Sequence, residues 1–286
     1  MALMYREVRQ LLLAKRAGAT FDRVLTVGRQ QLFLRRRDVG ALNQEFGRGT
    51  VGSDLASEGG YCDRMFRELF GVRELDAIDA SGHEGAMIVH DLNVPVGSSL
   101  HQSYNVIIDG GSLEHIFNVP VALASLMRML QVDGWLLLTN PANNLCGHGF
   151  YQFSPEFAFR VFRPANGFEL ERVSLVEARF PSVELSRRRP VLEVADPDQI
   201  GTRVLRLSSR VSMLMVLARK IQHLSEPFAH APQQSDYVAR WEEPSVLSQG
   251  ARGFTWLPLI ARQQLRGVRE IFRASRFNRQ AYTPSK

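Results

Sequence analysis

The stretches "FELERVSLVEA" (Phe168–Ala178) and "SRVSMLMVLARKI" (Ser209–Ile221) decide between the folds open to this chain. Each has the length and apolar character of a β-strand, and no convincing helical pattern lies between them. Two successive strands without a crossover helix must pair antiparallel, because a parallel pair needs a long connection. The sequence therefore predicts a sheet that closes with an antiparallel hairpin.

Upstream of this hairpin, strand patterns alternate with helical patterns. Strands are predicted over Arg23–Gly28, Glu74–Ser81, Ala86–Asn93, Tyr104–Gly111 and Trp135–Pro141. Helices are predicted over Leu3–Ala17, Cys62–Val72 with a stop at Gly71, Val119–Gly134 and, from a Ser-Pro cap, Ser154–Phe162. Continuous apolar strands separated by helices indicate a parallel sheet that is covered on both faces.

Composition limits the class of protein. The chain has 286 residues, of which 45% are apolar, so it can bury a substantial core. No apolar run approaches the roughly 20 residues that cross a bilayer, and the charged, amphipathic start differs from a signal peptide, so a cytoplasmic location is predicted. Cys62 and Cys146 lack CxxC spacing, and we predict no disulfide and no metal site. The net charge of +6 favours acidic or phosphorylated partners without naming one.

Three further motifs follow one another along the chain. They are "HDLN" (His90–Asn93), "DGGSLEHIFN" (Asp109–Asn118) and "PANNLCGHGFYQFSPE" (Pro141–Glu156). With the closing hairpin, they make the region from about Phe21 to Lys220 resemble a bacterial subgroup of class I S-adenosylmethionine-dependent methyltransferases. The resemblance implies an α/β fold: a Rossmann-like class I methyltransferase sheet, mostly parallel with a closing antiparallel hairpin. It also implies S-adenosyl-L-methionine as the cofactor.

The resemblance also suggests how the chain is divided. Residues 1–20 are expected to form an N-terminal helix, and residues 21–222 the methyltransferase-like domain, with a loop insertion at about 31–60. Residues 223–286 are expected to form a linker and a basic helical C-terminal extension. The insertion is rich in glycine and charge, and it either covers the pocket or is a passive surface loop.

Acidic residues close the second and third predicted strands, where ligands of an open α/β sheet bind. Asp79 is a candidate to accept hydrogen bonds from the ribose hydroxyls, by analogy with the ribose acid of dinucleotide folds; the alternative is a surface cap. The resemblance places Asp91 beside the adenine amino group, with Leu92 packing against the ring. An Asp followed closely by Asn is also ordinary turn chemistry.

The first strand departs from the family pattern. Methyltransferases usually carry a glycine-rich turn there, whereas this chain has Gly28 alone. Two interpretations remain open. Either Gly28 suffices, with Arg29 or Gln30 contacting the methionine carboxylate, or the fold is kept and the cofactor has been lost.

The end of the fourth strand is the predicted site of chemistry. Asp109, Gly110 and Gly111 are expected to form the floor under the transferred methyl group. An imidazole has an unperturbed pKa of about 6.5, so His115 is a candidate general base and His148 its competitor; either could instead be a structural donor. Acceptor contacts are expected from Glu114, Tyr151 and Gln152. The adenine N-methyltransferase signature Asn/Asp-Pro-Pro-Tyr/Phe is absent after this strand, which favours O-methylation of a small hydroxylated metabolite or sugar.

The C-terminal region carries a stripe of arginines at helical spacing. These are Arg262, Arg266, Arg269, Arg273 and Arg276. A basic amphipathic helix can meet nucleic acid, an anionic lipid surface or an acidic partner, although a solvated outer face is the more common explanation. We regard nucleic acid as an improbable partner. Pairing with a second copy or another protein through the helical extensions stays open.

Three hypotheses from different classes follow. The order of the motifs supports an active methyltransferase with a small-molecule acceptor. The lone Gly28 supports a catalytically inactive partner protein that kept the methyltransferase fold. A nucleic-acid-modifying methyltransferase rests on the arginine stripe alone.

Overall fold

The computed structural model describes residues 2–47, 54–55, 58–178, 189–242, 258, 260–261, 264–265, 268 and 278–285. Its main feature is a nine-stranded sheet. In spatial order the strands are β11 (Tyr282–Pro284), β9 (Val191–Val194), β8 (Phe168–Ala178), β10 (Val211–Lys220), β7 (Leu130–Asn143), β6 (Tyr104–Asp109), β2 (Arg23–Val27), β4 (Glu74–Asp79) and β5 (Ile88–Val89). A separate parallel pair joins β1 (Ala2–Leu3) to β3 (Gln31–Leu32).

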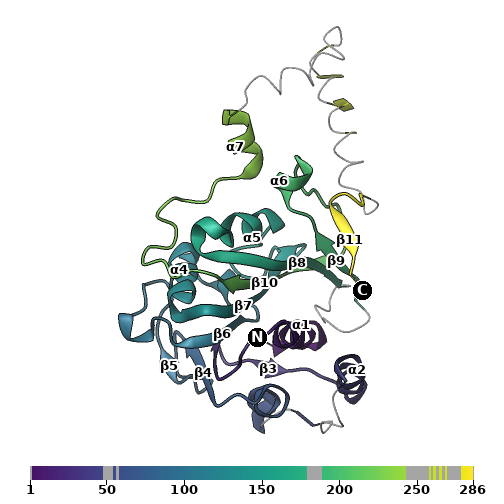
Figure 1. Cartoon of the computed structure of the whole chain (residues 1–286). Coiled ribbons are helices and arrows are strands. Elements are labelled where there is room, and N and C mark those ends of the chain that lie inside the picture. Colours follow the sequence, from purple (N-terminus) through teal and green to yellow (C-terminus); the bar gives the residue numbers. More distant parts are fainter. Residues whose placement is uncertain are drawn as a thin grey trace.

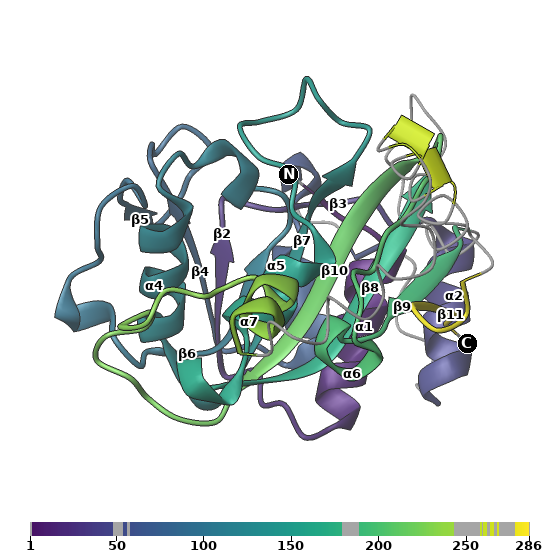
Figure 2. The same ribbon diagram turned by 90° about the horizontal axis from the view of Figure 1, so that it is seen from above.

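The direction of the strands confirms the predicted fold class. Strands β5, β4, β2, β6 and β7 run parallel to one another, whereas β10 runs antiparallel to both β7 and β8. Figure 2 shows β10 lying between β7 and β8. The chain is therefore a Rossmann-like α/β protein whose parallel central strands are followed, beyond β7, by the antiparallel pairings of β10, β8, β9 and β11.

Helices cover both faces of the sheet. The described α-helices are α1 (Tyr5–Arg16), α2 (Arg36–Phe46), α3 (Asp63–Met65) with a following π-helical turn (Phe66–Phe70), α4 (Val119–Met129), α5 (Pro155–Val161), α6 (Pro197–Ile200) and α7 (Ser235–Glu242), of which α7 stands away from the sheet (Figure 1). Successive strand residues point to opposite faces, so Leu25 and Ile107 pack with α4 and α5, whereas Val24 and Val106 pack with α1 and α2. Figure 1 shows these two layers.

Helix α1 is one of the covering helices. Val8, Leu11 and Leu12 are buried against the sheet. An ion pair of 2.6 Å between Arg9 and Glu45 joins α1 to α2. Helix α2, together with β3, lies within the stretch 31–60, for which the sequence led us to expect a loop. The described part of that stretch is therefore structured and packs beside α1.

The helix predicted over Val119–Gly134 is longer than the helix in the structure. Helix α4 ends at Met129, and Gly134 lies inside β7. Asp133 has a φ of +64° at an irregularity in the β6–β7 pairing, and a Cβ on Gly134 would approach the carbonyl oxygen of Asn105 to 2.9 Å. The "DG" pair therefore serves a tight bulge, where glycine permits close approach of two backbones, and not a helix end.

Several elements near the C-terminal half were not predicted. Strand β9 and helix α6 lie in the described part of the connection between β8 and β10, and β11 adds to the outer edge of β9. All five arginines of the predicted stripe lie outside the described residues. Both cysteines are free, and burial raises the pKa of the Cys62 thiol to about 12. No described helix is long and apolar enough to span a membrane.

Candidate functional site

The carboxyl ends of the parallel strands form one edge of the sheet. Val27, at the end of β2, pairs with Asp109 on one side and with Ile78 on the other. Asp79 pairs in turn with Val89 of β5. The topology thus brings the ends of four strands, and the turns that follow them, to the edge where open α/β sheets bind ligands.

Two buried carboxylates share one amide at this edge. Asp109 accepts hydrogen bonds from the Ser112 backbone nitrogen at 2.7 Å and from Asn140 Nδ2 at 2.6 Å. The same Nδ2 donates to Glu114 Oε2 at 3.0 Å. Burial, and then the neighbouring Glu114 charge, raise the pKa of Asp109 to about 6, and burial also raises the pKa of Glu114. Two buried carboxyl groups therefore lie close together, and the Asn140 amide is the donor that they share.

Asn140 is a site residue that sequence reasoning missed. It lies on β7 and is buried among apolar neighbours. A polar amide within the apolar run "WLLLTNP" was the available signal, since a buried polar group needs a partner. Its amide group holds Asp109 and Glu114 in place.

The structure brings both candidate histidines to the same carboxylate. Glu114 and His115 lie in a 3₁₀ turn after β6 (Leu113–His115), and His148 lies in the loop after β7. His148 Nε2 is 3.4 Å from Glu114 Oε1, and His115 Nε2 is 4.0 Å from it. The two rings meet edge to face with centroids 4.9 Å apart, and both side chains are about half exposed. Burial, together with the neighbouring His148, lowers the pKa of His115.

Glycines hold the two loops together. Gly111 has a φ of +104°, and the hydroxyl of Ser112 donates to the Val27 carbonyl at 2.7 Å, which ties the turn to β2. Gly149 has a φ of +74°, and the next residue, Phe150, donates its backbone N–H to the Glu114 carbonyl at 2.7 Å. The His148 loop is therefore fixed to the turn that carries Glu114.

Exposed aromatic rings follow both histidines closely in the sequence. Phe117 and Phe150 are 70% and 67% exposed, and their ring centroids are 5.8 Å apart. The Tyr151 hydroxyl donates to the Phe117 carbonyl, and Gln152 Oε1 accepts from the Leu145 backbone nitrogen. The predicted contacts Tyr151 and Gln152 thus make local structural bonds, whereas the two phenylalanines, which the sequence analysis did not select, present apolar surface.

The turn after β2 is compact. Gly28 is buried with a φ of +67°, and its N–H donates to the Ile78 carbonyl at 2.7 Å. The Arg29 guanidinium lies 3.9 Å from the Tyr61 ring centroid and 3.4 Å from Asp63. Gln30 is fully buried and donates back to the Val27 carbonyl. Of the two residues considered for a carboxylate contact, only Arg29 reaches the surface.

The predicted adenosine-binding residues have different surroundings. Asp79 is half-buried, its Oδ1 accepts from the Ser81 backbone nitrogen, and the exposed Val89 is its ladder partner. Asp91 is exposed, and its Oδ1 accepts from both the backbone and the side chain of Asn93, which is turn chemistry. Leu92 is buried in the core. Asp79 and Val89 could thus meet a ribose and an apolar ring, while Asp91 serves its own turn.

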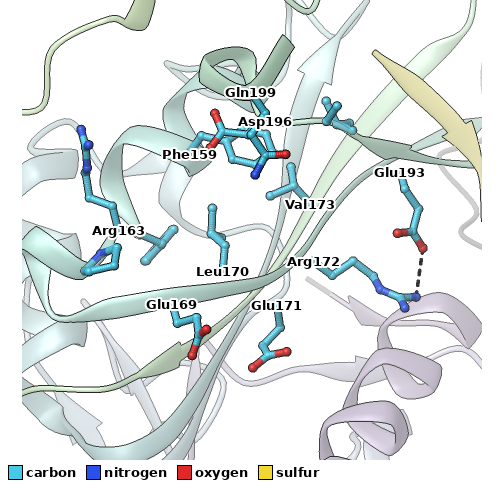
Figure 3. A pocket seen from close by; sticks show the side chains of 14 residues that line it. Phe159, Arg163, Glu169, Leu170, Glu171, Arg172, Val173, Glu193, Asp196 and Gln199 are labelled. Atoms are coloured by element: carbon cyan, nitrogen blue, oxygen red, sulfur yellow. Dashed lines mark ion pairs between the residues drawn. The ribbon is translucent and has the colours of Figure 1, made fainter. Parts of the chain in front are cut away.

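A cavity of about 360 Å³ lies elsewhere, among β8, β9 and α5 (Figure 3). Its lining includes Glu169 and Leu170, at the beginning of β8. This end of β8 pairs with the end of β10 that faces the start of β7, so the cavity is at the opposite edge from Asp109. Its lining pair Arg172 and Glu193 are joined at 3.3 Å. We take the carboxyl-end edge as the candidate site, because the polar cluster of Asp109, Glu114 and the two histidines lies there, where open α/β sheets bind ligands.

Comparisons with known proteins give distant likenesses. No family model and no curated protein matches the chain. Among solved structures, 1,6-didemethyltoxoflavin-N1-methyltransferase from Burkholderia thailandensis, with bound 1,6-didemethyltoxoflavin and S-adenosylhomocysteine, has a TM-score of 0.39 and 15% identity, covering 76% of this chain and 78% of that one. The N-methyltransferase NodS from Bradyrhizobium japonicum, in complex with S-adenosylhomocysteine, has a TM-score of 0.38 and 11% identity, covering 76% and 86%. At these values the likenesses assign no activity, and the fold assignment rests on the sheet itself.

Proposed function

We propose that the chain from about residue 21 to residue 222 is a class I S-adenosylmethionine-dependent methyltransferase domain. The observation that carries the proposal is the polar cluster of Asp109, Glu114 and two histidines at the carboxyl-end edge, next to the left-handed turn at Gly28. The reversed β10 and the order of the three sequence motifs support the same family. The bound cofactor would supply an electrophilic methyl group.

The residues at the edge would divide the work of binding. Gly28 lets the chain turn without a side chain in the way of the ligand, and Arg29 offers a cation near the surface. Asp79 would accept hydrogen bonds from the ribose hydroxyls, beside the apolar side chain of Val89. Gly111, with its φ of +104°, would let the backbone lie close under the methyl group. Because methyl transfer is an in-line displacement, such positioning supplies most of the rate enhancement.

The acceptor would lie over the histidine cluster. Phe117 and Phe150 provide exposed apolar surface there, and the half-exposed imidazoles of His115 and His148 provide polar contacts. Such a site suits a small molecule with one apolar face and at least one hydroxyl. Since the chain lacks the adenine N-methyltransferase signature, we propose an oxygen acceptor on a small hydroxylated metabolite or sugar.

The test is a calorimetric titration of the purified chain with S-adenosylmethionine and S-adenosylhomocysteine. Replacing Asp79 by Ala removes the proposed ribose acceptor and should weaken binding roughly 10- to 100-fold, which corresponds to about 1–3 kcal/mol. Glu74→Ala is the matched control, because this exposed carboxylate lies at the other end of the same strand. Binding that Asp79→Ala leaves unchanged would remove Asp79 from the site. Absence of binding to the unaltered chain would refute the proposal.

One observation favours the second candidate, a methyltransferase fold that no longer binds cofactor. The Arg29 guanidinium is already engaged by the Tyr61 ring and Asp63, and Gly28 stands without the usual further glycines. In that case neither titration would give a binding signal. The polar cluster at Asp109 would then need another ligand.

A further inference from the structure

Three side chains at the carboxyl-end edge point potential metal-binding atoms toward one another. Glu114, His115 and His148 each offer one ligand atom, and these atoms all lie within 4.8 Å of one another. Glu114 Oε1 is 3.4 Å from His148 Nε2 and 4.0 Å from His115 Nε2. The three residues come from two segments, the turn after β6 and the loop after β7, which the Phe150 to Glu114 backbone hydrogen bond holds together.

The buried carboxylate of Glu114 has an unsatisfied oxygen. Its side chain is 0% exposed and Oε2 accepts from Asn140, whereas the contact of Oε1 with His148 Nε2 is long, at 3.4 Å. A buried carboxylate oxygen that has only long contacts with imidazole nitrogens is weakly compensated, which native proteins seldom retain. This oxygen faces the two imidazole nitrogens, so the space between these three atoms is where a cation would bind.

The charge around Glu114 also favours a cation. Asp109 is fully buried and shares the Asn140 amide with Glu114, so two carboxylates lie close together away from water. Within the described part of the chain, the ion pairs of Glu114 are those with His115 and His148, and neither imidazole carries a permanent charge. A divalent ion beside Oε1 would neutralise this pair.

We propose that Glu114, His115 and His148 form a three-ligand site for a divalent first-row transition ion such as Zn²⁺. Two imidazole nitrogens and one carboxylate oxygen form a donor set that binds such ions in preference to Mg²⁺ or Ca²⁺. Zinc bonds of about 2.0–2.1 Å in tetrahedral geometry place ligand atoms about 3.4 Å apart, which matches the separation between Glu114 and His148. His115 Nε2, at 4.0 Å from Glu114 Oε1, would have to move inward to complete the set, and its half-exposed side chain is free to rotate.

The site would leave one coordination position open. Because both histidines are about half exposed, a fourth position would open toward solvent. Three protein ligands with one open position are typical of catalytic metal sites, whereas structural sites use four. Asn140, which orients Glu114 and also bonds Asp109, would be the supporting hydrogen-bond donor behind the ligand.

The use of the ion rests on the proposed function, although its binding does not. An acceptor hydroxyl bound at the open position would lose its proton to solvent more readily, because a divalent cation stabilises the alkoxide. The acceptor oxygen would then form the new O–CH₃ bond as the S–CH₃ bond breaks, and the sulfur keeps the bonding electron pair. The substrate class this implies is a hydroxyl compound whose reacting oxygen can ligate a metal.

The test is direct metal titration of the whole chain after treatment with a chelator. Zn²⁺ is added in a calorimeter, and Co²⁺ is followed by visible absorption, which reports tetrahedral coordination. We expect one ion per chain, and His115→Ala or His148→Ala should weaken binding at least about 100-fold, since each removes one of three protein ligands. His230→Ala is the matched control, because this exposed histidine lies outside the cluster and its loss should leave the affinity unchanged.

The outcomes separate this proposal from the proposed function. Zinc binding that depends on His115 and His148 supports the metal site even where S-adenosylmethionine does not bind. Cofactor binding without zinc binding overturns the metal site alone. The metal site is also overturned where zinc binds equally well to both histidine variants, or where His230→Ala weakens binding as much as they do. Because His115 and His148 are half exposed, these variants should still fold, and a thermal unfolding curve checks that they do.

Discussion

Gly149 controls the position of His148, and replacing it tests the architecture of the site independently of any ligand. A Cβ at Gly149 would lie 2.6 Å from the Glu114 carbonyl oxygen and 3.0 Å from its carbonyl carbon. The clash is with backbone, so a side-chain rotation cannot relieve it. The φ of +74° adds about 1–2 kcal/mol for any residue with a Cβ, and loss of the Phe150 to Glu114 hydrogen bond about 1 kcal/mol. Gly149→Ala should therefore destabilise the protein by about 2–3 kcal/mol.

Gly147→Ala is the matched control on the other side of His148. A Cβ at Gly147 meets no atom within 4 Å, and its φ is not among the positive values. Urea unfolding measures both variants, with stability taken from the midpoint at constant slope. Gly149→Ala should also weaken zinc binding, because the shifted loop moves His148 away from Glu114. Equal losses of stability in the two variants would refute the reasoning, as would a Gly149→Ala protein as stable as the unaltered chain.

Three further predictions concern stability elsewhere. Burial raises the pKa of Glu7 from its ordinary value of about 4.5 to about 7. Between these two pH values the folded state holds a proton that the unfolded state has lost. The free energy of unfolding therefore falls by roughly 3 kcal/mol as pH rises through that window. Glu7→Gln should therefore gain stability over the unaltered chain at about pH 8 and much less at about pH 4.5 in urea unfolding; a gain that does not change with pH would contradict this. Gly134→Ala should destabilise by about 2 kcal/mol or more, because its Cβ would meet two backbone carbonyl oxygens at 2.8 and 2.9 Å. Gly40→Ala, in the interior of α2 with no atom within 4 Å, should stabilise by about 1 kcal/mol, and thermal unfolding that ranks these two variants in the opposite order would show that the contacts are wrong.

The elements that could be predicted from sequence are those with strong local patterns. Strand β10 contains the unbroken apolar run of residues 213–218, and Ser154 caps α5 with its hydroxyl accepting from the Phe157 backbone nitrogen, as the Ser-Pro cap indicated. The predicted end of α4 was wrong because Gly134 also fits a helix terminus. Only its close approach to Asn105 across the sheet reveals the bulge. Strand β11 could not be found, since its partner β9 lies far away in the sequence.

The candidate site was predictable in its location and less so in its composition. The cluster after β6 was visible because acids and a histidine follow an apolar strand. From the sequence, His115 and His148 are alternative candidates for one role, whereas the fold sets both against Glu114. That relation depends on two loops that meet only in three dimensions. The same holds for Asn140, whose two carboxylate partners lie on another segment.

The place of β10 in the sheet has a consequence for how the protein folds. This strand is the sole link between β7 and β8 among the described strands, yet it follows both of them along the chain. During synthesis, β8 and its partner β9 therefore emerge without a connection to β7, and they can join the rest of the sheet only after residues 211–220 have left the ribosome. Pairings of such long sequence separation form slowly and leave strand edges open to wrong partners. The nascent chain should depend on chaperones most strongly in the interval between the appearance of β8 and the arrival of β10.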